Sequence, residues 1–277
     1  MYSGNVSTPT LTNCTFSRNV AGRAGGGMYG DAFNGMTLAN CIFRHNSADV
    51  SGGGVYSGDY SNPTLINCTL TGNSTNGSGG GMHNSYMATA TVGNCILWAN
   101  VDDADGSEGG PFADESAQIH VDGGSAAVNY TCIQGFVPGG DFDNGTNISD
   151  DPLFVPGPAG CYYLSQIAAG QAMDSPCVDA GDPASPLVGG TTRSDEDLDS
   201  GIVDMGYHYP VTGLPLVMGD SDRDGDVDLD DFAELQSCFT GEGPGDLSPC
   251  CRIFDFEPDD DVDLDDYAAF HAVFVGS

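Results

Sequence analysis

The stretch TLTNCTF at residues 10–16 returns as TLANCIF at 37–43, TLINCTL at 64–70 and TVGNCIL at 91–97, always 27 residues further on. A constant spacing over four copies indicates an internal structural repeat. Glycine runs at 25–27, 52–54 and 79–81 keep the same phase, as do Asn19, Asn46, Asn73 and Asn100. Cys132 follows Cys95 by one repeat plus ten residues, so we expect a fifth copy after an insertion in the acidic stretch at 101–116.

Each repeat contains short strand-like pieces separated by glycine, asparagine and serine, without helical periodicity. A unit of 27 residues cannot bury its own apolar side, whereas stacked copies bury a continuous column. Equivalent residues then recur about 4.8 Å apart along the stack. We therefore expect ladders of cysteine, aliphatic residues and asparagine, the last at coil corners where its side chain tolerates unusual backbone angles.

The repeats NCTFSRN (13–19) and GGGMYGD (25–31) resemble those of right-handed parallel β-helix proteins, in particular secreted and surface proteins of the planctomycete type. The resemblance covers roughly residues 1–210. It implies a mainly β solenoid with about 27 residues per coil. It leaves the activity open, because this solenoid carries lyases, hydrolases, adhesins and inert surface proteins.

Charge and hydropathy limit the classes of partner that the protein is expected to bind. Forty acidic residues against six arginines and no lysine give a formal net charge of −34. This charge argues against nucleic acid and against an anionic membrane surface. No apolar run is long enough to insert into a bilayer. Met1 is in phase with Met28 and Met82, so we expect the natural protein to begin earlier, with any signal peptide upstream and an extracellular or cell-surface location.

The cysteines form two groups. Those of the repeats (Cys14, Cys41, Cys68, Cys95 and Cys132) are interpreted as an inward apolar ladder, since reactive or metal-binding thiols would have to lie side by side in an apolar core. Cys161 and Cys177, and Cys238 with Cys250 or Cys251, lie in irregular regions where disulfides fit an extracellular chain.

Four segments are predicted: repeats over 1–150, final coils and a cap over 151–210, a linker over 211–218, and a separate domain over 219–277. In the cap, SPCVDAG (175–181) and VDMGYHY (203–209) resemble the closing segment of the planctomycete-type proteins. Asp179, Asp204 and His208 are interpreted as turn and capping residues rather than as catalytic groups.

Residues 220–231, DSDRDGDVDLDD, match a calcium loop. Oxygen ligands at loop positions 1, 3, 5 and 12 converge on one ion, position 7 offers its carbonyl, and glycine at position 6 permits the turn. The ligands assigned here are Asp220, Asp222, Asp224, Asp226 and Asp231.

A partial copy of this loop and of the helix after it follows 35 residues later. Its ligands are Asp255, Glu257, Asp259, Asp261 and Asp266. Two such units resemble a dockerin, a module with paired calcium loops and helices that binds a cohesin domain. The resemblance implies calcium and a cohesin-like or other surface partner. Asp260 and Glu257 depart from the pattern and predict a weaker second site, and Leu229-Asp230 and Leu264-Asp265 differ from cellulosomal dockerins. A solvated acidic tail is the alternative.

One aromatic position recurs on the coils. Tyr2, Tyr29, Tyr56 and His83 share one phase next to the inward Met1, Met28, Val55 and Met82, so their rings should point outward in a row. Such a row either contacts sugar rings or simply stabilises the sheet face.

Three functions remain open on this basis. The first is an extracellular β-helix protein that binds glycans or surfaces and is tethered by its calcium module. The second is a polysaccharide lyase or glycoside hydrolase, and the third is a structural or assembly protein. Asp31 and Asp59 lie on adjacent coils, as a glycosidase carboxyl pair would require, but no residue is assigned as catalytic.

Overall fold

The structure is a computed structural model, and it describes all residues except 104–113, 212–216, 222–225, 240–248, 258, 260 and 275–277. The chain divides into two compact units. Unit 1 comprises Met1–Pro152, Ser175–Gly189 and Asp199–His208, and unit 2 comprises Leu153–Asp174, Gly190–Leu198 and Tyr209–Ser277.

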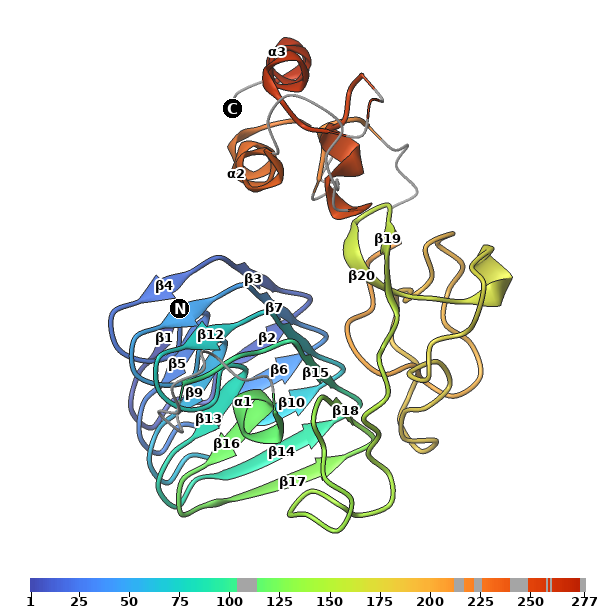
Figure 1. Ribbon diagram of the computed structural model, residues 1–277. Coiled ribbons are helices and arrows are strands. Elements are labelled where there is room, and N and C mark those ends of the chain that lie inside the picture. The colour runs from blue at the N-terminus through green and yellow to red at the C-terminus, as the bar shows by residue number, and fades with distance from the viewer. Residues whose placement is uncertain are drawn as a thin grey trace. The chain divides into compact units, whose positions relative to one another are not determined.

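Unit 1 is a parallel β-solenoid whose coils are stacked from the blue end of the chain to the green part (Figure 1). Its described strands form four parallel sheets. Sheet 1 contains β1 (Tyr2–Ser3), β5 (Met28–Gly30), β9 (Val55–Ser57), β13 (Met82–Asn84) and β16 (Ile119–Val121). Sheet 2 contains β2 (Thr10–Thr12), β6 (Thr37–Ala39), β10 (Thr64–Ile66), β14 (Thr89–Gly93) and β17 (Ser125–Asn129). Sheet 3 contains β3 (Thr15–Ser17), β7 (Ile42–Arg44), β11 (Thr69–Thr71), β15 (Ile96–Trp98) and β18 (Cys132–Ile133). Sheet 4 contains β4 (Val20–Ala21), β8 (Ser47–Ala48) and β12 (Ser74–Thr75).

The strand register confirms the 27-residue period. Leu38 pairs with Leu11 and Leu65, and Phe43 pairs with Phe16. Ile96 pairs with Cys132, which places the fifth coil after the insertion as expected. Helix α1 (Glu115–Gln118) closes the described part of that insertion and leads into β16.

The core is a column of ladders. Met28, Val55, Met82 and Ile119 line it from sheet 1, and buried leucine, valine and phenylalanine residues line it from the other sheets. Cys41, Cys68, Cys95 and Cys132 are buried, and all five ladder cysteines are free thiols, as the apolar interpretation predicts.

Asparagine occupies two kinds of corner. Asn13, Asn40, Asn67 and Asn94 have φ between 50° and 56°, a left-handed conformation that asparagine adopts more readily than most residues. The second kind is a buried ladder in which Nδ2 of Asn46 donates to Oδ1 of Asn73 at 2.9 Å. Gln118 completes this ladder, since its Oε1 accepts from Nδ2 of Asn100 at 2.8 Å. Hydrogen bonds therefore run along the stack inside the coil.

The glycine runs have a steric reason. Gly52 has a φ of 62°, and a Cβ on the following Gly53 would lie 2.3 Å from the carbonyl oxygen of Ser74. Only glycine allows the backbones of neighbouring coils to approach this closely.

The described residues of 151–210 add no strand to the four parallel sheets. β19 (Phe154–Gly157) and β20 (Gly160–Leu164) form an antiparallel hairpin in unit 2, followed by η1 (Ile167–Ala169). Two later segments bind the asparagine corner of unit 1 instead. The N–H of His208 donates to Oδ1 of Asn40 at 2.7 Å, and the N–H of Asp182 donates to Oδ1 of Asn94 at 2.8 Å.

Unit 2 also contains α2 (Leu229–Cys238), η2 (Pro249–Phe254) and α3 (Leu264–Val273). Its small core joins Val227, Leu235, Phe254, Val262 and Phe270. A disulfide joins Cys238 to Cys251, which selects one of the two pairings left open by the sequence. Cys177, which was expected in a disulfide, is instead a buried free thiol. No described helix in the chain has the length and apolar character needed to cross a membrane.

Candidate functional site

The predicted aromatic row is a continuous ring stack on sheet 1. The ring centroids of Tyr2 and Tyr29 lie 5.6 Å apart, those of Tyr29 and Tyr56 4.9 Å, and those of Tyr56 and His83 5.3 Å. The stack extends to His120, whose ring lies 5.0 Å from that of His83. The sequence pattern missed His120, because the insertion moves it out of the 27-residue phase. We call these five side chains the first row.

The first row exposes its edges rather than its ring faces. Neighbouring rings from Tyr2 to His83 are within 12° of parallel, so each ring covers the face of the next. Tyr2 is 65% exposed, whereas His83 is only 7% exposed. Nδ1 of His83 also lies 3.0 Å from Oγ of Ser78. Of the four predicted residues, the tyrosines therefore offer the accessible surface.

Burial changes the chemistry of His83. Burial and, secondarily, the neighbouring His120 lower the pKa of His83 to about 4. The imidazole is therefore neutral at pH 7, and it can accept or donate a hydrogen bond without carrying charge.

A second aromatic row follows directly after the strands of sheet 1. Phe33 and Tyr60 stack at 5.2 Å and 7°, and Tyr86 meets Tyr60 edge to face at 5.9 Å. Phe33 is 55% exposed, Tyr60 44% and Tyr86 51%. The sequence contains the signal, because Phe33 and Tyr60 share the repeat phase, but Val6 and Met87 occupy that phase on the flanking coils and hide the pattern. We call these three side chains the second row.

Carboxylates lie between the two rows. Asp31 follows Tyr29 by two residues and precedes Phe33 by two, and Asp59 follows Tyr56 by three residues and precedes Tyr60 by one. The hydroxyl of Tyr2 donates to Oδ2 of Asp31 at 2.8 Å. The Ala32 N–H and the Tyr2 hydroxyl lower the pKa of Asp31.

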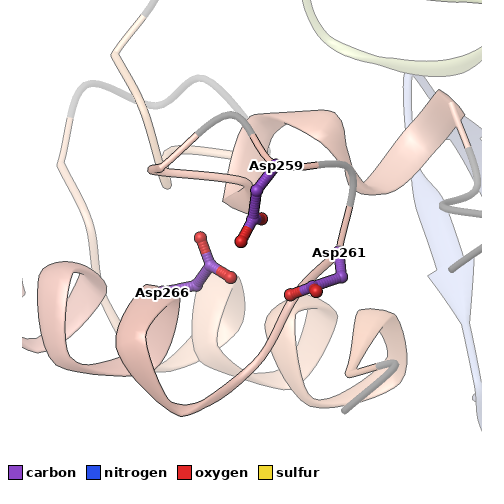
Figure 2. A group of neighbouring side chains, drawn as sticks. All are labelled: Asp259, Asp261 and Asp266. Atoms are coloured by element: carbon purple, nitrogen blue, oxygen red, sulfur yellow. The ribbon is translucent and has the colours of Figure 1, made fainter. Parts of the chain in front are cut away.

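The predicted calcium loops, both in unit 2, form the second candidate site. Carboxylate oxygens of Asp259, Asp261 and Asp266 all lie within 4.8 Å of one another, and Figure 2 shows the three side chains converging. Oxygens that share one calcium ion at about 2.3 to 2.6 Å can be at most about 5 Å apart. The group therefore fits a single calcium ion. Of the other two predicted ligands, Asp255 is buried nearby, with its Oδ1 3.3 Å from the N–H of Asp259, and Glu257 is exposed.

The aspartate at position 12 accepts equivalent hydrogen bonds within each of the two loops. At position 12 of the first loop, Asp231 accepts the N–H of Ser221 at 2.6 Å and that of Asp228 at 2.9 Å. At position 12 of the second, Asp266 accepts the N–H of Phe256 at 2.7 Å and that of Asp263 at 2.9 Å. Asp220, Asp231, Asp255, Asp261 and Asp266 are all buried, and the burial of ionised carboxylates is costly unless hydrogen bonds or a cation offset it. Of the remaining predicted ligands in the first loop, Asp226 is exposed, and Asp222 and Asp224 lie outside the described residues.

Comparison with known families agrees with the stacked coils. Residues 1–163 match the family described as the right handed beta helix region. The match covers more than half of the chain. The chain belongs to this family. No curated protein and no solved structure matches the chain.

In this right-handed β-helix protein, local hydrogen bonds hold Asp179, Asp204 and His208, the polar residues singled out in the predicted cap. Oδ1 of Asp204 accepts the N–H of Asp179 at 2.6 Å, and Oδ1 of Asp179 accepts the N–H of Ile202 at 3.1 Å. Nε2 of His208 pairs with Oδ2 of Asp199 at 3.0 Å, and both side chains are almost fully buried. Each of the three residues is therefore held by hydrogen bonds within residues 179–208.

Proposed function

We propose that this β-helix protein is extracellular, binds a polysaccharide along its two aromatic rows, and is tethered through a calcium-dependent, dockerin-like unit. The observation that carries the proposal is the second row beside the first. Phe33, Tyr60 and Tyr86 are about half exposed although each is a large apolar ring. Exposed apolar surface of this kind is characteristic of ligand-binding and partner-binding sites.

The two rows complement each other chemically. The first row presents tyrosine edges and hydroxyls, which can exchange hydrogen bonds with sugar hydroxyls. The second row presents rings that can pack against the apolar C–H surface of a sugar. Because both rows follow the repeat, they offer similar contacts coil after coil. A linear polymer of repeating units matches such a surface better than a compact ligand.

The equivalence of the two predicted calcium loops supports the proposed tether. Leu229 and Leu264 occupy position 10 of the two loops, and each is 66% exposed. An apolar groove of about 370 Å³ between α2 and α3 is lined by Phe232, Leu235, Gln236, Phe239, Leu264 and Tyr267. Calcium bound in the two loops would hold both helices in place for a cohesin-like or other surface partner.

Affinity electrophoresis through gels that contain single polysaccharides tests the binding activity. We expect at least one polysaccharide to retard the wild-type protein, and the double variant Phe33→Ser, Tyr60→Ser to migrate freely. The exposed pair Val137→Ser, Leu187→Ser is the control for loss of surface apolarity elsewhere. Release of new reducing ends or unsaturated uronides from the retarding polysaccharide would instead indicate a hydrolase or lyase. Equal retardation of both double variants would refute binding along the rows.

Binding to immobilised cohesin-type domains tests the tether. We expect binding in calcium and none in chelator. Since either loop can face the partner, Leu229→Arg and Leu264→Arg should each retain binding while the double variant loses it. Binding that persists in chelator would contradict the proposal.

A further inference from the structure

The two carboxylates between the aromatic rows carry information about the ligand. We propose that Asp31 and Asp59 select a linear polysaccharide that bears free amino groups. This inference rests on the proposed polysaccharide binding and adds the chemical class of the polymer.

The two carboxylates lie on adjacent coils of the β-helix. Tyr29 and Tyr56 pair in adjacent strands, so Asp31 and Asp59, two and three residues further on, lie on adjacent coils. Both carboxylates act on the same ring. The pKa of Tyr29 is raised by burial, by Tyr56, by Asp31 and by Asp59, while the single nearby cation among these groups, Arg23, acts in the opposite direction. A polymer lying along the rows therefore passes a negative charge on two successive coils.

Hydrogen bonds hold the two carboxylates in place without using all of their acceptor positions. Asp31 accepts the Ala32 N–H at 2.8 Å and the Tyr2 hydroxyl at 2.8 Å. Asp59 accepts the hydroxyl of Ser85 at 2.7 Å and is exposed. An ionised carboxylate offers about four acceptor positions, so each group keeps capacity for an external donor. Their orientation is fixed before a ligand arrives, which reduces the entropy lost on binding.

The net charge of the chain limits the classes of polysaccharide that can bind. The chain carries a formal net charge of −34, and it contains no lysine. A polyuronate would be repelled by this surface, and a neutral polysaccharide would offer the carboxylates only uncharged donors. An ammonium group on the sugar adds the Coulomb attraction between opposite charges to the hydrogen bond. Complementarity therefore favours an amino polysaccharide over the other two classes.

Because any polycation is attracted to so acidic a protein, the test needs a charge-matched control. Isothermal titration at physiological salt would compare oligomers of glucosamine, N-acetylglucosamine and galacturonate of equal length. The double variant Asp31→Asn, Asp59→Asn removes two charges between the rows. The control Asp49→Asn, Asp103→Asn removes two exposed charges of unit 1, one directly after β8 and one two residues after Val101.

We expect the glucosamine oligomer to bind at least about tenfold more tightly than the N-acetylated one, a difference of roughly 1.4 kcal/mol. Asp31→Asn, Asp59→Asn should abolish that preference while the control retains it. Equal loss in both variants would show general charge attraction and overturn the inference. Equal binding of both glucosamine-type oligomers would also overturn it, but would leave the proposed polysaccharide binding standing. Failure of every polysaccharide to bind would refute both.

Discussion

Nδ2 of Asn73 donates a hydrogen bond of 2.8 Å to Oδ1 of Asn100, one coil further along the stack. The same nitrogen lies 2.9 Å from the carbonyl oxygen of Phe43, and Oδ1 of Asn73 accepts from Asn46. Every polar atom of this buried amide is therefore used to join coils. Asparagine at this phase stabilises the stack in a way that an apolar residue cannot.

We expect Asn73→Ala to lower the free energy of unfolding of unit 1 by about 3 kcal/mol, because several buried partners lose their hydrogen bonds together. Denaturant unfolding followed by circular dichroism measures this. Asn62→Ala is the matched control, since Asn62 is exposed and should change stability by less than about 0.5 kcal/mol. Equal effects of the two substitutions would show that the ladder contributes no stability.

The buried cysteines of the thiol ladder should not react with thiol reagents in the folded protein. Burial raises the pKa of Cys68, and the neighbouring Cys68 thiol together with burial raises the pKa of Cys41. Thiols that stay protonated and inaccessible are poor nucleophiles. With an aromatic disulfide reagent, we expect the folded protein to react only at the partly exposed Cys14, and Cys14→Ser to remove that reaction. Rapid reaction of several thiols before denaturation would contradict the buried ladder.

His83 should make the stability of unit 1 depend on pH. Its pKa is lowered from 6.5 to about 4, so folding favours the neutral imidazole. The stabilisation is complete above about pH 6.5 and is lost as the pH falls towards 4, by about 3 kcal/mol in total. His83→Tyr keeps an aromatic ring in the row and removes the titration. Melting curves between pH 7 and pH 4.5 should therefore fall less steeply for His83→Tyr than for wild type, and parallel curves would argue against this assignment.

Calcium should hold residues 219–277 in their folded form. The carboxylates of both loops repel one another without a cation, so chelation should unfold residues 219–277 and leave the β-helix intact. Calorimetry in calcium and in chelator would show this as the loss or shift of one transition. An unchanged transition for this segment in chelator would disprove the calcium loops.

The second loop offers a matched pair for the same question. Asp259 belongs to the converging group, whereas Asp265 is exposed and lies outside it. We expect Asp259→Asn to weaken calcium binding about tenfold and Asp265→Asn to change it little, as measured by calcium titration. Similar losses in the two variants would point to general acidity rather than to a site.

Much of unit 1 could be predicted from the period alone. A 27-residue spacing determines which residues pair, so the alignment of Thr37, Leu38 and Phe43 with their neighbours in the stack is read directly from the sequence. The left-handed corners at Asn40 and its equivalents follow from the tolerance of asparagine for that conformation.

The rest depends on information that a repeat does not contain. His120 and Gln118 occupy ladder positions only after an insertion shifts the phase, and no local pattern indicates where the chain returns. A hairpin formed by β19 and β20 lies where further coils were expected. Its two strands pair antiparallel across a tight turn, whereas the strands of neighbouring coils pair in parallel. The second aromatic row was obscured because Val6 and Met87 interrupt its aromatic character at both ends.

We expect the polysaccharide to lie along the two aromatic rows, and hydroxyl-radical footprinting of the wild-type protein measures this contact residue by residue. Mass spectrometry would compare oxidation of each tyrosine and phenylalanine with and without the polysaccharide that retards the protein most strongly. We expect reduced oxidation of Tyr2, Tyr29, Phe33 and Tyr60, with Tyr130 and Tyr162 unchanged. Unchanged oxidation of both rows while the polysaccharide is bound would contradict it.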